Sequence, residues 1–393
     1  MKYRIFVFVF IFFIAKVSFA QVTPVYVVLF THIEDNTPSG ALGTSECKQQ
    51  YLLLRNKMIS MANLAKSYDV KWSFEPDWKL LEAALIYEDT TIIKSTNNKN
   101  FLRYLKEDLG VAIDPHSHEK SGYNYTDVAH LLDSLGVGAT KVIGGHVWDP
   151  NLTQFQNWDR FRVPVKGTKY PWAVWRGEIL MGSGTPNHVN DPLVTGVWRP
   201  KDKLNYFVDD PNGNIFCIGK YIGDITSTTE LINLYKNKKV SESCMLTSSY
   251  HIKPADITSQ FGLRAIEDTV LKPLTTLRNG GEVVLTDFTA LIQEWKSLFN
   301  SNACIYDPAG TTNVDIGNTE VLDLDKCYPN PFSNRIIIKG ISGDTQYELF
   351  DSRGHIIWSG KNIEQSDFSY LANDLYFVKV KNKNLIKLIK IIK

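Results

Sequence analysis

The sequence predicts an α/β protein in which an irregular (β/α)7-type barrel over residues 21–307 precedes a small all-β sandwich over residues 326–393. Seven short apolar runs in the first part alternate with helical patterns, as the strands of a parallel sheet do. In the last part, short runs of alternating apolar and polar residues are separated by turn residues, with no room for a helix. This change of pattern predicts two domains.

The first strand candidate, residues 25–30, is continuously apolar, which predicts a strand buried on both faces. The other strand candidates are residues 70–74, 110–114, 141–145, 215–221, 244–250 and 281–285. Helical periodicity covers residues 45–69, 100–110, 126–136, 227–239 and 288–299. Ser227 and Glu230 have the spacing of a capping box. Residues 148–211 form a long insert without clear periodicity.

Composition and charge exclude some classes of partner. Apolar residues make up 44% and charged residues 22% of the 393, which is ordinary for a globular protein. The formal net charge is +1, so nothing in the charge balance favours nucleic acid or an anionic membrane surface as a partner. No segment after the first twenty residues is apolar for long enough to predict a transmembrane segment.

Residues 1–20 are predicted to be a signal peptide. Lys2 and Arg4 form a basic start, an apolar run follows, and small residues precede a cleavage site after Ala20. Export makes disulfides possible, and an odd number of cysteines leaves at least one thiol unpaired within the chain. Buried, apolar cysteines are the alternative to a bridge. The five are Cys47, Cys217, Cys244, Cys304 and Cys327.

The C-terminal sandwich follows residues 308–325, which read as a polar linker. The motifs "YPNPFS" at Tyr328 and "YELFDSRG" at Tyr347, with the basic and apolar tail, resemble the C-terminal sorting domain of type IX secretion substrates. The resemblance implies a Bacteroidota-type bacterium, the type IX secretion machinery as a partner, and a secreted or cell-surface location. A carbohydrate-binding or adhesive sandwich is the alternative.

Histidines follow the predicted strands at the end where barrels of this kind place their chemistry. Five of the eight histidines lie there: His32, His116, His118, His146 and His251. Acidic residues share the same edge: Glu34, Asp35, Glu75, Asp114, Asp149, Asp224 and Asp287. Together these groups predict a site.

His116 and His118 are one residue apart. If the strand continues past Asp114, both imidazoles point to the same face and can share a tetrahedral ion with a carboxylate from another strand. Nitrogen ligands favour zinc, nickel or copper over magnesium or calcium, so the predicted cofactor is a divalent metal, with zinc as the first choice. A polar loop after Pro115 is the alternative. His146 is the reserve ligand.

The register His32-Ile33-Glu34-Asp35-Asn36 resembles the first motif of the polysaccharide deacetylase family, whose fold is an irregular (β/α) barrel. The resemblance implies that Glu34 is the general base and Asp35 a metal ligand. His116-Ser117 matches the start of the family's histidine motif, but Lys120 stands where the second histidine belongs, so His118 would substitute for it.

Later motifs extend this resemblance. "SSYHIKP" makes His251 the candidate general acid, and residues 280–296 are similar to the family's last strand and helix. A family arginine corresponds to Arg162 or to Arg199, and the sequence does not choose between them.

The long insert holds the candidate substrate contacts. Aromatic faces with polar edges suit sugar rings, which predicts glycan binding by Trp148, Trp172, Trp175 and Trp198. The alternative is that these tryptophans form the core of the insert.

The leading prediction is a secreted, metal-dependent hydrolase that removes acyl groups, specifically acetyl groups, from a carbohydrate. Two alternatives stay open. One is a metal-free glycoside hydrolase that uses two carboxylates such as Glu34 and Asp224. The other is a non-catalytic glycan-binding protein on a deacetylase-like barrel, because Lys120 and His32 depart from the family motifs.

Overall fold

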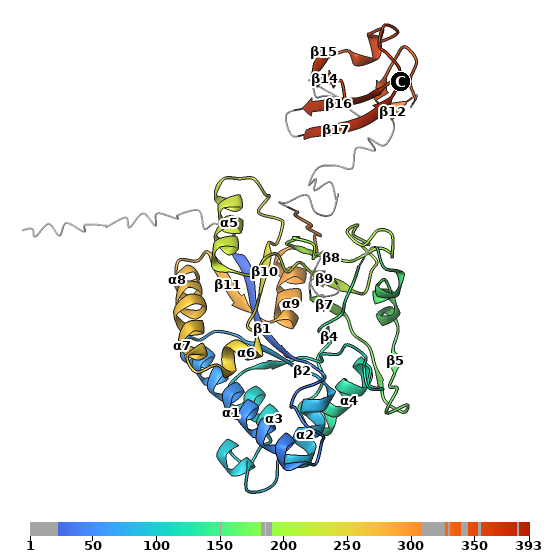
Figure 1. Cartoon of the computed structure of the whole chain (residues 1–393). Coiled ribbons are helices and arrows are strands. Elements are labelled where there is room, and N and C mark those ends of the chain that lie inside the picture. Colours follow the sequence, from blue (N-terminus) through green and yellow to red (C-terminus); the bar gives the residue numbers. More distant parts are fainter. Residues whose placement is uncertain are drawn as a thin grey trace, which may run out of the picture. The chain divides into compact units, whose positions relative to one another are not determined.

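The computed structural model describes residues 23–149, 151–181, 185, 191–307, 327–328, 331–338, 345–352, 355–382 and 385–393 (Figure 1). The expected signal peptide and linker lie outside these residues. The chain divides into two compact units, Met1–Ile316 and Gly317–Lys393, and the division falls inside the expected linker. Within the described residues, none of the helices combines the length and apolar character that a membrane-spanning helix needs.

The first unit is built around strand β1 (Val25–Ile33), which is parallel to each of its neighbours. One edge of β1 pairs with β10 (Thr247–His251), and the other pairs first with β11 (Val283–Thr286) and then with β2 (Ser73–Pro76). β3 (Ala112–Ile113) continues the sheet beyond β2. Alternate residues of β1 enter two different apolar cores, as its continuously apolar sequence predicts.

A second sheet contains β4 (Val142–Ile143), β7 (Ile179–Met181) and β9 (Phe216–Ile218) in parallel, with β8 (Val197–Trp198) antiparallel to β9. Backbone hydrogen bonds join the two sheets at both ends. Gly144 N donates to Pro115 O at 3.0 Å, and Ser249 N donates to Lys220 O at 2.9 Å.

Each of the seven predicted strands is present, but the insert contains strands that were not predicted. It supplies β7, β8 and the hairpin of β5 (Val165–Lys166) and β6 (Val174–Trp175), where no element was expected. These strands are two or three residues long, too short to show a period in the sequence.

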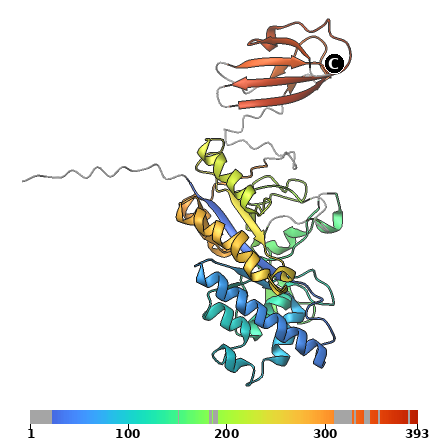
Figure 2. The same cartoon turned by 60° about the vertical axis from the view of Figure 1, so that its left-hand side comes forward.

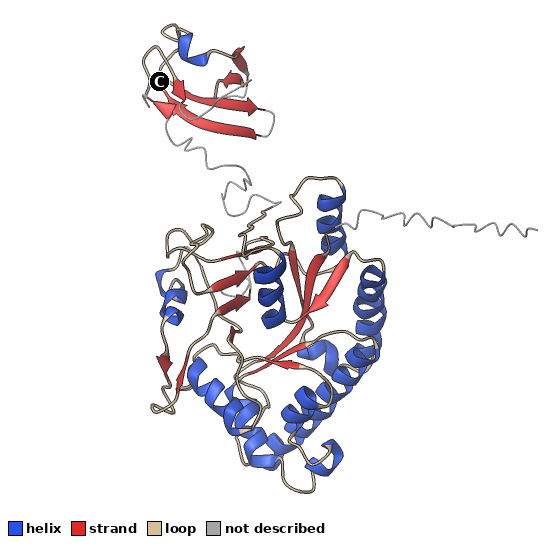
Figure 3. Cartoon of the chain, turned by 180° about the vertical axis from the view of Figure 1, so that it is seen from behind, coloured by secondary structure: helices blue, strands red, loops and turns tan. Residues whose placement is uncertain are grey.

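The helices pack on both faces of the central sheet. The first core, on one face of β1, includes residues of α1 (Ser45–Ser67), α2 (Trp78–Tyr87), α3 (Phe101–Glu107), α4 (Tyr125–Ser134), α5 (Ile225–Lys236), α6 (Pro254–Thr258), α7 (Gly262–Ile266) and α8 (Lys272–Asn279). The second core joins the other face of β1 to β4, β7 and β9 through α9 (Phe288–Leu298). Figure 3 accordingly shows α9 between the strands of the two sheets.

Helix α5 begins differently from the prediction. Its N-cap is Asp224, whose carboxylate accepts from the backbone N of Ser227 at 2.7 Å. The expected capping box at Ser227 and Glu230 is therefore wrong, because Ser227 already lies inside the helix. Asp287 caps α9 in the same way as Asp224 caps α5.

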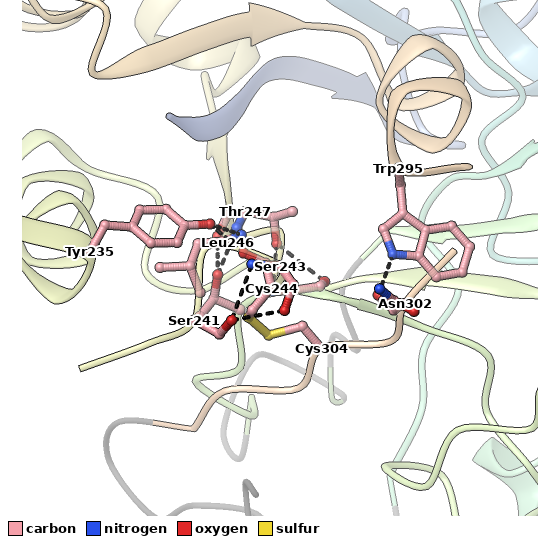
Figure 4. The surroundings of a disulfide bond; sticks show 11 residues. Tyr235, Ser241, Ser243, Cys244, Leu246, Thr247, Trp295, Asn302 and Cys304 are labelled. Atoms are coloured by element: carbon pink, nitrogen blue, oxygen red, sulfur yellow. Dashed lines mark hydrogen bonds between the residues drawn. A yellow bond between two sulfur atoms is a disulfide. The ribbon is translucent and has the colours of Figure 1, made fainter. Parts of the chain in front are cut away.

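A disulfide between Cys244 and Cys304 ties the residues before β10 to the segment that follows α9 (Figure 4). The same segment is held by backbone hydrogen bonds of 2.9 Å, from Cys304 N to Val197 O and between Tyr306 and Thr195 in both directions. Cys47 and Cys217 are buried free thiols.

The second unit is built on β-strands, as predicted, and its described residues also include one short 3-10 helix, η6 (Ile363–Gln365) (Figure 2). One antiparallel sheet has the order β15 (Ile356–Gly360), β14 (Gln346–Phe350), β16 (Leu375–Asn382) and β17 (Leu385–Ile392). A two-stranded sheet pairs β12 (Cys327–Tyr328) with β13 (Ile337–Ile338). Their shared core includes Phe332, Leu349 and Val378.

Candidate metal and catalytic site

Four of the five predicted histidines meet at one edge of the central sheet. His32 lies near the end of β1 and is paired with Glu75 of β2, while His251 is the last residue of β10. His116 follows β3 and forms a parallel bridge with Gly144. Because these strands are parallel, their carboxyl ends deliver the side chains to the same place.

The imidazole rings are stacked. The ring of His32 lies between those of His251 and His116, with centroid distances of 4.1 and 4.6 Å. His118 meets His116 edge to face at 5.0 Å, and His251 also stacks on Phe30 at 5.0 Å. The cluster is thus continuous with the apolar face of β1.

Glu34 joins two of these histidines. Its Oε2 lies 3.0 Å from Nε2 of His118 and its Oε1 lies 3.2 Å from Nε2 of His32. The hydrogen bonds with His118 and His32 hold the pKa of Glu34 well below its usual range. The hydrogen bond with Glu34 in turn raises the pKa of His118. These shifts favour a charged His118 ring beside a deprotonated Glu34.

Glu75 and His116 form the buried part of the site, with both side chains 0% exposed. Oε2 of Glu75 lies 3.4 Å from Nδ1 of His116. Burial, and then Asp114, raises the pKa of Glu75, whereas burial lowers the pKa of His116. Among the buried atoms without a hydrogen-bond partner in the described part of the chain, three belong to this cluster: Nδ1 of His32, Oε1 of Glu75 and Nε2 of His116. Such atoms are rare in folded proteins and require a partner.

Two groups of three residues place one ligand atom each within 4.8 Å of the others. The inner group is His32, Glu75 and His116, and the outer group is Glu34, His116 and His118. His116 belongs to both. Asp35, the expected carboxylate ligand, belongs to neither of these groups in the described part of the chain. Glu34, the expected base, is the carboxylate of the outer group.

Two glycines make room for the inner group. A Cβ on Gly144 would lie 2.6 Å from Oε2 of Glu75, and a Cβ on Gly145 would lie 2.2 Å from Cε1 of His116. Both contacts are closer than real Cβ atoms allow. Gly145 also has a φ of +73°, which favours glycine. Neither glycine was predicted to have a role in the site.

Asp77 was not among the predicted site residues. This buried carboxylate caps α2, accepting from Trp78 N at 2.5 Å, while its Oδ2 has no partner among the described residues. Burial raises the pKa of Asp77 to about 7. An aspartate directly before an apolar helical run is an N-cap signal that the sequence contained.

The other predicted polar residues have partners elsewhere. His146 packs edge to face against Phe161. Arg162 donates to the carbonyl oxygens of Pro200 and Lys201, and Arg199 forms an ion pair with Asp209. Both arginines thus tie the insert together.

The predicted tryptophans differ sharply in exposure. Trp148, Trp175 and Trp198 are buried in a core of the insert, as the alternative interpretation expected. Their burial leaves these rings no surface for a sugar. Trp172 is 71% exposed, so substrate contact stays a proposal for this ring alone.

His146 predicts an acid-sensitive stability. Burial, and then Arg160, lowers its pKa from 6.5 to about 3, so the folded state disfavours the charged ring. The unfolded chain binds the proton more readily, so this contribution to stability is present above pH 6.5 and is lost as the pH falls toward 3. We expect His146→Gln to shrink the difference in urea midpoint between about pH 7 and about pH 4.5. His355→Gln, at an exposed histidine, is the control and should leave that difference unchanged.

Comparison with known proteins identifies the second unit. Residues 326–393 match the family model described as the secretion system C-terminal sorting domain. This part of the chain is a sorting domain. The match confirms the predicted type IX sorting domain, and the sorting domain points to export and to a surface or secreted location. No curated protein sequence matches the chain.

The solved structures that match the chain include the following two. PorZ, described as an essential bacterial surface component of the type-IX secretion system of Porphyromonas gingivalis, matches with 19% identity and a TM-score of 0.17. The match covers 20% of this chain and 12% of PorZ, so this chain spans only a small part of that protein. A candidate glycoside hydrolase/deacetylase from Parabacteroides distasonis matches with 9% identity and a TM-score of 0.43, over 94% of this chain and 82% of that chain.

Proposed function

We propose that residues 21–307 form an exported, metal-dependent hydrolase that removes acetyl groups from a carbohydrate. The observation that carries the proposal is the cluster of His32, Glu75 and His116, in which three buried polar atoms lack hydrogen-bond partners among the described residues. Imidazole and carboxylate groups brought together from separate strands suit zinc. The sorting domain supports action outside the cell.

The proposal includes a (β/α) barrel. Its support is the pair of backbone links that connect the two sheets, one between the ends of β3 and β4 and one between the residues after β9 and β10. In a nearly closed ring of strands, the candidate site lies at the carboxyl ends, where barrel enzymes carry their chemistry.

The residues of the cluster can divide the work of hydrolysis. His116 would hold the ion with an imidazole and a carboxylate from the inner or the outer group, and a bound ion lowers the pKa of coordinated water to about 7 and polarises a carbonyl. Glu34 accepts the proton as the water oxygen adds to the carbonyl carbon. His251 donates a proton to the leaving nitrogen or oxygen as its bond to that carbon breaks.

A cavity of about 540 Å³ adjoins His251 and offers space for the leaving sugar. Its lining includes Asp224 and Tyr250 from the central part of the unit and Asp256 and Val270 from the segment of α6 to α8. Carboxylates beside apolar walls suit a ring that carries hydroxyls on an apolar frame.

The test combines metal analysis with acetate release by the purified chain without its signal peptide. We expect a stoichiometric amount of zinc, and release of acetate from acetylated glycans that stops with a chelator and returns with zinc. If the protein holds no stoichiometric metal after zinc is supplied, the metal-dependent hydrolase is ruled out and a non-catalytic glycan-binding protein becomes the better explanation. New reducing ends without acetate, unaffected by the chelator, would support the glycoside hydrolase instead.

A further inference from the structure

We infer that the ion is held by the inner group, His32, Glu75 and His116, and that Glu34 and His118 stay outside it as a hydrogen-bonded pair. This inference rests on the proposed function and specifies its metal site. It departs from the ligand set that the sequence motifs implied, Asp35, His116 and His118.

Unsatisfied atoms distinguish the two groups. Each inner residue has one buried nitrogen or oxygen without a hydrogen-bond partner among the described residues. A fully buried carboxylate such as Glu75 needs a positive partner, and a divalent ion close to it and to two imidazoles supplies one. In the outer group, both carboxylate oxygens of Glu34 already accept hydrogen bonds, one from His118 and one from His32.

The distances agree with this choice. The 3.4 Å between Oε2 of Glu75 and Nδ1 of His116 exceeds the usual hydrogen-bond range. This long contact joins atoms other than the unpartnered Oε1 of Glu75 and Nε2 of His116, so it leaves those two atoms available to an ion. The 3.0 Å between Glu34 and His118 is instead an ordinary hydrogen-bond length. Gly144 and Gly145 keep the space beside Glu75 and His116 free of side chains.

Glu34 gains a defined role in this arrangement. It accepts a hydrogen bond from Nε2 of His32, which leaves Nδ1 of that ring as the atom with a free lone pair. A carboxylate that fixes the tautomer of a metal-binding histidine is a common feature of metal sites. Glu34 is therefore a positioning residue for His32, besides its proposed work as a base.

The experiment measures Co²⁺ binding, from its visible absorption bands, in the purified full chain without its signal peptide. Glu75→Gln and His32→Gln should each weaken Co²⁺ binding by more than about 100-fold, beyond the loss typical of outer-shell changes. His118→Gln should lower Co²⁺ affinity by less than about tenfold, below the range typical of groups that hydrogen-bond a metal ligand directly, because His118 contacts Glu34 and not one of the proposed ligands. Thermal unfolding followed by circular dichroism checks that each variant is folded.

The His118→Gln variant decides the question even if a buried variant fails to fold, since the His118 side chain is 24% exposed. Loss of Co²⁺ binding in His118→Gln would overturn the inference and leave the proposed function standing on the outer group. Retention of Co²⁺ by a folded Glu75→Gln variant would overturn it as well. A wild-type chain that binds neither Co²⁺ nor Zn²⁺ would instead remove the proposed function itself.

Discussion

Replacing His116 by alanine is expected to abolish stoichiometric zinc binding, and acetate release with it. His116 is the residue common to both candidate groups, and its ring is fully buried between Glu75 and the other histidines. Removal of this ring leaves two ligands in either group, which do not hold a labile ion against dilution. We expect the affinity for zinc to fall by more than about 100-fold, measured by competition with a chromogenic chelator.

The matched control is His355→Ala, which removes an exposed imidazole from the sorting domain. This variant should keep the zinc content and activity of the wild type. Because His116 is buried, its replacement also creates a cavity, so the thermal unfolding of the metal-free forms must be compared. Full zinc content in a folded His116→Ala protein would contradict the proposed site.

Deleting residues 327–393 is expected to stop delivery to the cell surface and leave a folded protein in the periplasm. The deletion removes the sorting domain but none of the residues of the first unit. Fractionation of a host that has the type IX system, with detection of the chain in each fraction, measures the effect. Formation of the Cys244–Cys304 disulfide in the truncated protein reports that the first unit has folded.

The control for this deletion is the full chain with His355→Ala, which alters one exposed side chain of the same domain. That variant should reach the surface normally. Normal surface delivery of the truncated chain would mean that export does not depend on the sorting domain.

The sequence was most informative where a pattern extends over many residues. The continuous apolar run of β1 predicted a strand covered on both faces, and the alternating runs after residue 325 predicted the sheets of the second unit. Strand ends also predicted that His32, His116, His118 and His251 lie together, because parallel strands bring their carboxyl ends to the same edge whatever the details of the loops.

The position of each side chain relative to the histidine cluster depended on register, which the sequence did not reveal. β1 extends to Ile33, so His32 continues the alternation of Val28 and Phe30 toward the second core and is part of the strand. Glu34 is the next residue in that alternation, whereas Asp35 is one residue out of step with it. A family motif alone assigned the ligand to Asp35.

The sequence also did not reveal which tryptophans of the insert are buried. Trp148 and Trp198 have the same residue type as the exposed Trp172, and only the packing of short strands against each other separates core rings from surface rings. Strands of two residues leave too little pattern to show this in advance.

The disulfide between Cys244 and Cys304 gives the first unit a mechanical property. Tyr306 and Asp307 are the last described residues of this unit, so tension applied from the C-terminal side reaches the strand contact of Tyr306 before the disulfide. The backbone hydrogen bonds to Thr195 and Val197 resist this tension until they break. The disulfide is covalent, so it transmits the tension to the residues just before β10 in the central sheet. Tension at the C-terminal end of the first unit therefore acts on the central sheet directly and does not unfold the unit sequentially from α9.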